Sequence, residues 1–204
     1  MQFLMTLPLP AIYSAPPLLF VERLSVKLQF SIVQGAPMNS LVIYFSRAGE
    51  NYAVGKIEKG NTEVIAEYIK EFTGADLFRC DPAEPYSENY RECCREAIAK
   101  QSSDARPELT AYLDSIEDYD VIYIGGPVYC GEYPQEIYSQ LDRLSFVGKV
   151  IKPFTTHEGS GLGKCVEVLR KKCAGGKVEE GLAIKGSEVL LPESKALVRD
   201  WVIR

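Results

Sequence analysis

Apolar and polar positions fall into a regular pattern from Ser40 onward. Residues 41–45 form a short apolar run rich in β-branched and aromatic side chains, which is typical of a strand buried on both faces of a parallel sheet. After Gly60 the spacing changes, and the apolar residues recur as on one face of a helix: Val64, Ile65, Tyr68, Ile69 and Phe72. The pattern therefore predicts a strand, a loop and a helix in succession.

The same alternation of strands and helices continues to the end of the chain. Further strands are predicted at residues 75–80, 121–124, 150–155 and 177–184, and further helices at residues 88–100, 135–144, 162–172 and 193–203. A repeated strand–helix order is typical of a parallel sheet with helices on both faces. We therefore predict a three-layer α/β/α domain with a five-stranded parallel sheet over residues 40–204.

Residues 1–39 do not share this pattern. Their first half is apolar but broken by prolines, and it lacks the basic start and continuous apolar block of a secretory signal. In the second half, apolar residues alternate with polar ones, which is the period of a half-buried strand; the apolar positions are Leu24, Val26, Leu28, Phe30 and Ile32. One interpretation is an added edge strand. The other, which we favour, is a dispensable N-terminal extension ahead of a functional start at Met38.

Length, hydrophobic content and net charge limit the kinds of molecule that the protein is expected to bind. The chain has 204 residues, 46% of them hydrophobic, which suits one well-buried domain rather than two. A formal charge of −5 argues against a nucleic-acid backbone or an anionic membrane as partner. No apolar run approaches the roughly 20 residues of a membrane span. We expect a soluble, cytoplasmic protein that binds a small ligand or a basic protein partner.

The cysteines do not indicate a metal centre. There are six, at positions 80, 93, 94, 130, 165 and 173, and no two of them have CxxC spacing. With a single histidine, His157, the chain cannot complete a zinc-ligand set at these spacings. We expect reduced, mostly buried thiols, as is usual in the cytoplasm. A redox role for some of them is the alternative.

Three loops carry the main functional signal, and each follows a predicted strand. They comprise residues 46–62, 125–134 and 155–163, and all are rich in glycine, hydroxyl and aromatic residues. The carboxyl ends of parallel strands lie at one edge of the sheet, so we expect the three loops to meet there. The first loop leads into the N-terminus of a helix, whose N–H groups and dipole favour an anion. A phosphate group is predicted at that position.

Two common phosphate-binding motifs do not match. A P-loop requires Ser or Thr after GK, but the sequence GLGKC places Cys165 there and Glu158 at the position of the first glycine. A dinucleotide fingerprint requires GxGxxG, but Gly159, Gly161 and Gly163 are spaced GxGxG. The sequence therefore favours neither ATP nor a bound dinucleotide.

The segments YFSRAG…GNTEVIAEYI, YIGGPVYCGEYP and PFTTHEGSGLG together resemble the flavodoxin-like superfamily, in particular its short-chain flavodoxin group. The resemblance runs from about residue 40 to the end, with the three loops in the family's order. It implies strand order 2-1-3-4-5 and non-covalently bound FMN. It also implies that the phosphate is held by Ser46, Ala48, Asn61 and Thr62. One side of the isoalloxazine would be bordered by Tyr129 and by the backbone of Gly126, Pro127, Val128 and Cys130. Its other side would be bordered by Thr155, His157, Gly159 and Ser160.

One segment departs from the family's pattern. The family's compact phosphate loop reads Ser/Thr-x-Thr-Gly-Asn-Thr, whereas here GENYAVGKIEK separates Ala48 from Gly60. If the two halves still close, the insert projects as a flap beside the cofactor, with Tyr52 as a stacking or partner contact. Ala48 is therefore a weaker phosphate contact than Asn61 and Thr62, which the helix start positions.

Each predicted contact has a structural alternative. Ser46, Asn61 and Thr62 are also common loop and helix-capping residues, and Arg47 pairs with the phosphate or faces solvent. For Tyr129 we favour flavin stacking over core packing, and for His157 positioning over acid–base catalysis. Cys130 is expected to be a packing residue. Negative charge from Glu132 and Glu158 near the flavin would lower its reduction potential.

Three functions follow from this interpretation. The favoured one is an FMN-binding redox protein that transfers electrons between a reductase and an acceptor partner. The second is an NAD(P)H-dependent quinone or nitro-compound reductase of the same fold, with the insert as one wall of its pocket. The third is a flavin-free binding module, since fold alone does not determine function. No residue is identified as an acid–base catalyst.

Overall fold

The computed structural model describes residues 38–204, and the chain enters the sheet at Ser40. The edge strand considered for residues 24–32, and all of the N-terminal extension before Met38, lie outside the described residues. Within residues 38–204, no helix has the length and apolar character needed to cross a membrane.

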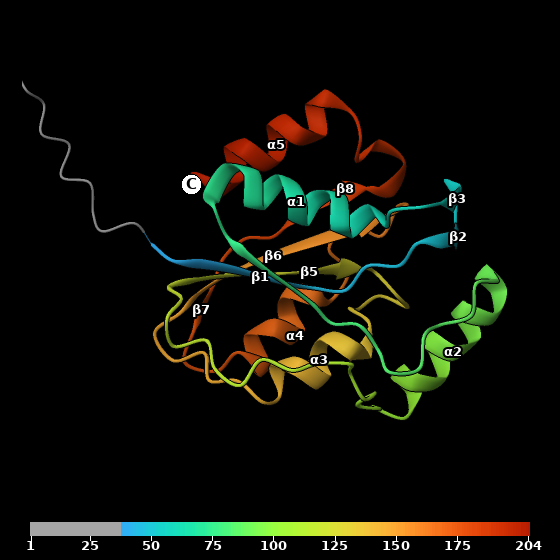
Figure 1. Ribbon diagram of the computed structural model, residues 1–204, viewed down its shortest axis with the longest axis horizontal. Helices are drawn as coiled ribbons and strands as arrows, with labels where there is room; N and C mark the ends of the chain where they lie inside the picture. Colours follow the sequence, from blue (N-terminus) through green and yellow to red (C-terminus); the bar gives the residue numbers. More distant parts are fainter. Residues whose placement is uncertain (1–37) are drawn as a thin grey trace, which may run out of the picture. The chain divides into compact units, whose positions relative to one another are not determined.

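A parallel sheet forms the centre of the fold (Figure 1). Its strands are β1 (Ser40–Tyr44), β4 (Asp76–Arg79), β5 (Val121–Pro127), β6 (Val150–His157), β7 (Lys177–Val178) and β8 (Leu182–Lys185). β1 pairs with β4 on one side and with β5 on the other, and β6 follows β5. β7 and β8 both pair with β6, so together they hold the fifth position. The predicted order 2-1-3-4-5 is confirmed.

The last predicted strand, residues 177–184, is divided at Glu179–Gly181. β7 pairs with Val150 and Ile151, and β8 resumes the pairing at Phe154. The break therefore lies opposite Lys152 and Pro153. Because proline has no N–H to donate, it cannot continue the ladder on the side that β7 and β8 occupy.

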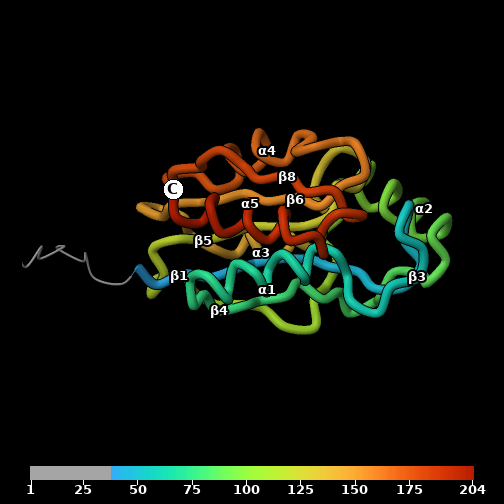
Figure 2. Tube along the Cα trace, turned by 90° about the horizontal axis from the view of Figure 1, so that it is seen from above, coloured from blue at the N-terminus to red at the C-terminus, as the bar shows by residue number. Residues whose placement is uncertain are grey.

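Helices cover both faces of the sheet, as predicted. They are α1 (Asn61–Thr73), α2 (Tyr90–Ser102), α3 (Gln135–Leu141), α4 (Cys165–Lys172) and α5 (Pro192–Val202), with a short 3₁₀ helix, η1 (Gly186–Glu188). α1 and α5 lie on one face, and α3 and α4 on the other (Figures 1 and 2). α4 begins later than the predicted residue 162, because Gly161 and Gly163 have φ of 58° and 51°, outside the right-handed helical region.

Alternation along the strands divides the core into two clusters. Val42 and Tyr44 of β1 pack with α1 and α5, whereas Leu41 and Ile43 pack with α3 and α4. All four of these side chains are at most 4% exposed. Successive strand residues point to opposite faces, so an apolar run such as residues 41–45 supplies both layers.

The insert in the first loop forms an antiparallel hairpin, β2 (Gly49–Asn51) with β3 (Gly55–Ile57). It projects beyond the carboxyl edge of β1, beside the start of α2 (Figures 1 and 2). The backbone N–H of Tyr90, the first residue of α2, donates to the Glu50 carboxylate at 2.9 Å. The hairpin and α2 therefore flank the edge of the sheet at which the three loops meet.

Candidate functional site

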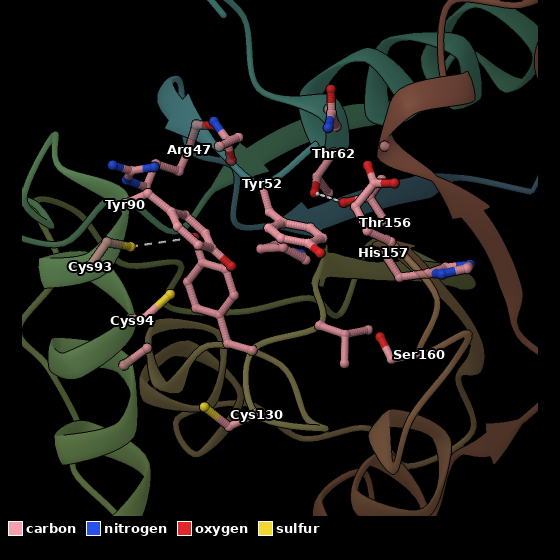
Figure 3. A pocket seen from close by; sticks show the side chains of 18 of the residues that line it. Arg47, Tyr52, Thr62, Tyr90, Cys93, Cys94, Cys130, Thr156, His157 and Ser160 are labelled. Atoms are coloured by element: carbon pink, nitrogen blue, oxygen red, sulfur yellow. Dashed lines mark hydrogen bonds between the residues drawn. The ribbon is translucent and has the colours of Figure 1, made fainter. Parts of the chain in front are cut away.

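A pocket of about 490 Å³ opens at the carboxyl edge of the sheet. All three predicted loops contribute to it, as does the N-terminus of α1 (Figure 3). The predicted site residues that line it are Ser46, Arg47, Asn61, Thr62, Pro127, Val128, Tyr129, Cys130, His157, Gly159 and Ser160. The structure thus brings together residues that are more than 100 positions apart in the sequence.

Hydroxyl and amide groups gather where α1 begins. Ser46 is buried, and its Oγ accepts a hydrogen bond from the backbone N–H of Glu63 at 3.0 Å. Thr62 is 2% exposed, and its Oγ1 lies 2.7 Å from Oγ1 of Thr156. Gly60 allows this close packing, because a Cβ there would lie 2.2 Å from the Ser46 Oγ. The N-terminal end of α1 faces the pocket, with the positive end of its dipole directed at the predicted phosphate position.

Arg47 has a role that neither sequence interpretation anticipated. Its guanidinium donates to the backbone carbonyl oxygens of Ser87 at 2.6 Å and Glu88 at 2.8 Å, and also to that of Glu50. The side chain therefore connects the first loop to the segment that leads into α2, although it also borders the pocket. Ala48, the neighbouring residue, does not line the pocket.

The second loop forms a tight turn at the pocket wall. The N–H groups of Tyr129 and Glu132 donate to each other's carbonyl oxygens at 2.8 and 3.1 Å, with Cys130 and Gly131 at φ of 51° and 89°. Positive φ at both central residues is the geometry of a type I′ turn. Gly126 lies behind this wall, since a Cβ there would lie 2.8 Å from Ile137 Cδ1 of α3.

The ring of Tyr129 is positioned by other aromatic side chains. It packs edge-on against Phe45 and Tyr86, with ring centroids 6.1 and 5.9 Å apart. The Cys93 thiol lies 3.9 Å from the Tyr129 hydroxyl oxygen, and burial raises the pKa of this hydroxyl well above its ordinary value. Tyr129 is therefore neutral at pH 7 and held by the core while it lines the pocket.

In the third loop, the structure places Thr156 at the pocket rather than the predicted Thr155. Thr155 is 1% exposed, and its hydroxyl donates to the carbonyl of Gly161 at 2.9 Å rather than facing the pocket. Thr156 lines the pocket instead. β6 continues to His157, beyond the predicted end at Thr155, so the alternation of the strand directs the second threonine to the pocket.

His157 is neutral at pH 7. Its Nδ1 accepts the backbone N–H of Gly159 at 2.9 Å, and burial lowers its pKa below the ordinary histidine value. Glu158 also lines the pocket, and its carboxylate accepts the N–H and the hydroxyl of Ser187 at 2.8 and 3.1 Å. Glu132, the other predicted acidic neighbour, is not among the lining residues.

One wall of the pocket combines a predicted part with an unpredicted one. The insert was expected to form a flap beside the pocket, and its Asn51 and Tyr52 line it; the contribution of α2, through Tyr90, Cys93, Cys94, Ala97 and Ile98, was not predicted from the sequence. The helical spacing of residues 88–100 predicts α2 but does not say against what it packs. The sequence therefore predicts the hairpin side of this wall but not its α2 side.

Comparisons with known proteins agree with this geometry. Residues 39–203 match a sequence model of a protein family described as flavodoxin. A search of curated proteins by sequence returns no match. Similar solved structures include a candidate flavoprotein from Bacteroides uniformis, with a TM-score of 0.66 and 23% identity, for which the alignment covers 83% of this chain and 100% of that chain.

Two further structures are similar over most of the chain. A candidate flavoprotein from Bacteroides eggerthii has a TM-score of 0.63 and 26% identity, with 81% of this chain and 96% of that chain covered. A flavoprotein from Lactobacillus acidophilus, solved in complex with FMN, has a TM-score of 0.55 and 24% identity, with 74% and 96% covered. Because the family match extends over residues 39–203 and the strand order agrees with it, this chain belongs to the flavodoxin family.

Proposed function

We propose that this protein binds FMN in the pocket and transfers electrons between a reductase and an acceptor protein. The observation that carries the proposal is the meeting of all three predicted loops, with the start of α1, around one pocket. The FMN complex of the Lactobacillus acidophilus flavoprotein, which shares the fold, supports the choice of cofactor. Bound FMN would supply the redox chemistry, and the protein would supply binding, orientation and electrostatics.

The residues of the pocket fit the two chemical ends of FMN. The start of α1, with Ser46, Asn61 and Thr62, offers N–H, amide and hydroxyl donors for a phosphate. At the other end, Tyr129 and the turn at Cys130 offer an aromatic ring and backbone for the isoalloxazine. The Glu158 carboxylate adds negative charge to the pocket, which disfavours an anionic reduced flavin and lowers its reduction potential.

The net charge and the free thiols support the redox partner and the cellular location that we propose for this protein. The formal charge of −5 would steer a basic redox partner, so association would weaken as salt is added. All six cysteines lie within residues 38–204 and are free thiols, which fits a cytoplasmic location.

The test is an absorption spectrum after incubation with FMN and desalting. We expect flavin bands near about 370 and 450 nm in the wild type, and their loss in the double variant Asn61→Asp with Thr62→Asp, because carboxylates at the start of α1 repel a phosphate. The matched control, Thr110→Asp with Ser115→Asp, adds the same two charges at exposed positions outside the pocket and is expected to retain the bands. A wild type that takes up no FMN would refute the proposal and favour the flavin-free binding module.

The second candidate function is a quinone or nitro-compound reductase that uses NAD(P)H. The wall formed by α2 and the hairpin favours it, because it adds α2 side chains that enclose the pocket beyond the three loops. Steady consumption of NAD(P)H with a quinone, in the absence of an added reductase, would favour this function over the carrier.

A further inference from the structure

Two threonine hydroxyls meet in the pocket from elements that are far apart in the sequence. Thr62 is the second residue of α1, and Thr156 lies one residue before the end of β6. Their Oγ1 atoms are 2.7 Å apart, which is the distance of a hydrogen bond (Figure 3). The two residues are only 2% and 4% exposed, and both line the pocket. The contact therefore joins the helix that follows the first loop to the strand that leads into the third.

This pair of hydroxyls has one proton more than it uses. Each threonine hydroxyl carries one proton and can accept through two lone pairs. One proton lies between the two oxygens, and neither oxygen makes another hydrogen bond within residues 38–204. The second proton is therefore left without an acceptor in the described part of the chain. Because a buried donor without an acceptor is costly, this proton indicates an acceptor inside the pocket.

The surroundings of Thr62 favour a phosphate as that acceptor. A phosphate monoester is mostly dianionic at pH 7 and offers acceptor oxygens, so it matches a spare donor. Thr62 lies in the first turn of α1, where the helix dipole favours an anion. The acidic residue of this turn, Glu63, has its carboxylate 3.2 Å from a guanidinium nitrogen of Arg79. The charge of Glu63 is therefore compensated and opposes an anion less.

We propose that Thr156 is a positioning residue for the FMN phosphate and that it acts through Thr62. The Thr156 hydroxyl donates to Thr62 Oγ1, and the Thr62 hydroxyl donates to a phosphate oxygen. A hydroxyl that accepts a hydrogen bond becomes a stronger donor, so Thr156 both orients and strengthens the contact that Thr62 makes. The inference rests on the proposed function. It gives Thr156 a part in the preference for FMN over riboflavin, which lacks the phosphate.

The backbone around Thr156 is fixed before any ligand binds. Its carbonyl oxygen accepts the N–H of Val128 at 3.0 Å, and in the sheet it pairs with Pro127 on one side and Ile184 on the other. A β-branched side chain also has few rotamers. Thr62 is held in α1, so the two oxygens meet without the ordering of a loop. Donors that are fixed in this way lose little entropy on binding.

The experiment compares FMN with riboflavin, which shares the isoalloxazine and the ribityl chain. Flavin fluorescence titrations give the Kd of each ligand. Thr62→Val removes a hydrogen bond to a charged group, so FMN binding should weaken roughly 10- to 100-fold. Thr156→Val removes a neutral hydrogen bond, so FMN binding should weaken by roughly 2- to 12-fold. Riboflavin binding should change little in either variant, and Thr156→Ser should bind FMN as the wild type does because it keeps the hydroxyl.

Two further measurements test whether Thr156 acts through Thr62. The double variant Thr62→Val with Thr156→Val should bind FMN no more weakly than Thr62→Val alone. The phosphorus NMR signal of bound FMN should shift in Thr156→Val, although this side chain does not contact the phosphate in the proposed arrangement. Thr73→Val is the matched control, because Thr73 lies at the other end of α1 and outside the pocket. It should leave both Kd values and the phosphorus signal unchanged.

The wild-type titration separates this inference from the proposed function. A wild type that does not bind FMN would refute both. If the wild type binds FMN, an unchanged Kd and phosphorus signal in Thr156→Val would overturn only the inference. Equal weakening of FMN and riboflavin would assign the pair to the rest of the flavin or to the fold, and a larger FMN loss in Thr156→Val than in Thr62→Val would reverse the direction of donation. Either result contradicts the role proposed for Thr156. If riboflavin binds too weakly to measure, the phosphorus signal decides.

Discussion

A buried ion pair attaches α2, and with it the side of the pocket that α2 lines, to the rest of the fold. The Glu136 side chain of α3 is 0% exposed, and its carboxylate lies 2.8 Å from Lys100 Nζ of α2 and accepts the Tyr86 hydroxyl at 3.1 Å. The ammonium of Lys100 also lies 3.8 Å from the centroid of the Tyr86 ring. The substitution Glu136→Gln keeps the shape of the side chain but leaves the Lys100 ammonium without its counter-ion.

The expected loss of free energy of unfolding depends on how deeply Glu136 and Lys100 are buried. Removal of one member of a fully buried pair costs about 3–5 kcal/mol. The Lys100 side chain is 24% exposed and regains part of its hydration, so we expect a loss of about 2–3 kcal/mol. For a protein of this size, that loss lowers Tm by roughly 4–12 °C.

The assay is urea unfolding followed by circular dichroism, which gives the free energy of unfolding and its dependence on urea. Glu167→Gln on α4 is the matched control. The Glu167 carboxylate lies 2.7 Å from Nζ of its exposed partner Lys171. The loss of free energy of unfolding in this control is expected to fall within experimental error. The double variant Glu136→Gln with Lys100→Met should be more stable than Glu136→Gln alone, because no uncompensated ammonium remains. A Glu136→Gln variant as stable as the control would refute the reasoning.

Two further predictions concern the α1 start and alkaline pH. Gly60→Ala places a Cβ within 2.2 Å of the Ser46 Oγ and should weaken FMN binding by roughly tenfold in a fluorescence titration; an unchanged Kd would contradict the placement of the phosphate. Burial raises the pKa values of Tyr44, Tyr123, Cys165 and Cys173 to about 12, so the unfolded chain releases these protons first, from pH 9 to 10 upward. Stability should therefore be complete below pH 9 and decrease as the pH rises towards 12. Lys152, whose pKa burial lowers, acts in the opposite direction, but it is one group against many buried tyrosines and cysteines whose pKa values burial raises. A urea midpoint that stays constant from pH 8 to 11 would contradict this sign.

The fold was largely predictable because its signals are local. Residues 41–45 and 121–124 are short apolar runs enriched in β-branched and aromatic side chains, which favours strands buried on both faces, and the helical spacing from Val64 to Phe72 favours a helix with one buried side. The meeting of the three loops was predictable for a topological reason. Parallel strands all end at the same edge, whatever the length of chain between them.

The contacts of individual side chains were less predictable. Thr155 was expected at the pocket, but β6 runs on by two residues to His157, and the alternation of the strand turns Thr155 towards Gly161 and Thr156 towards Thr62 at the pocket. Arg47 was expected to meet a phosphate or solvent, and instead bonds to carbonyls about 40 positions away. Both outcomes depend on contacts that form only in the folded chain and that a short stretch of sequence does not reveal.

The strand and helix order, the edge of the sheet at which the pocket opens, and the three loops that line this pocket were predictable from the sequence alone. That α2 completes the pocket, and that Tyr52 meets Tyr90, could be seen only in the folded chain. Long-range contacts place α2, and the sequence does not reveal them. Its Lys100 reaches Glu136 on α3, and its first N–H reaches Glu50 on the hairpin. Hydrophobic spacing predicts which side of a helix is buried, but not the surface against which it packs.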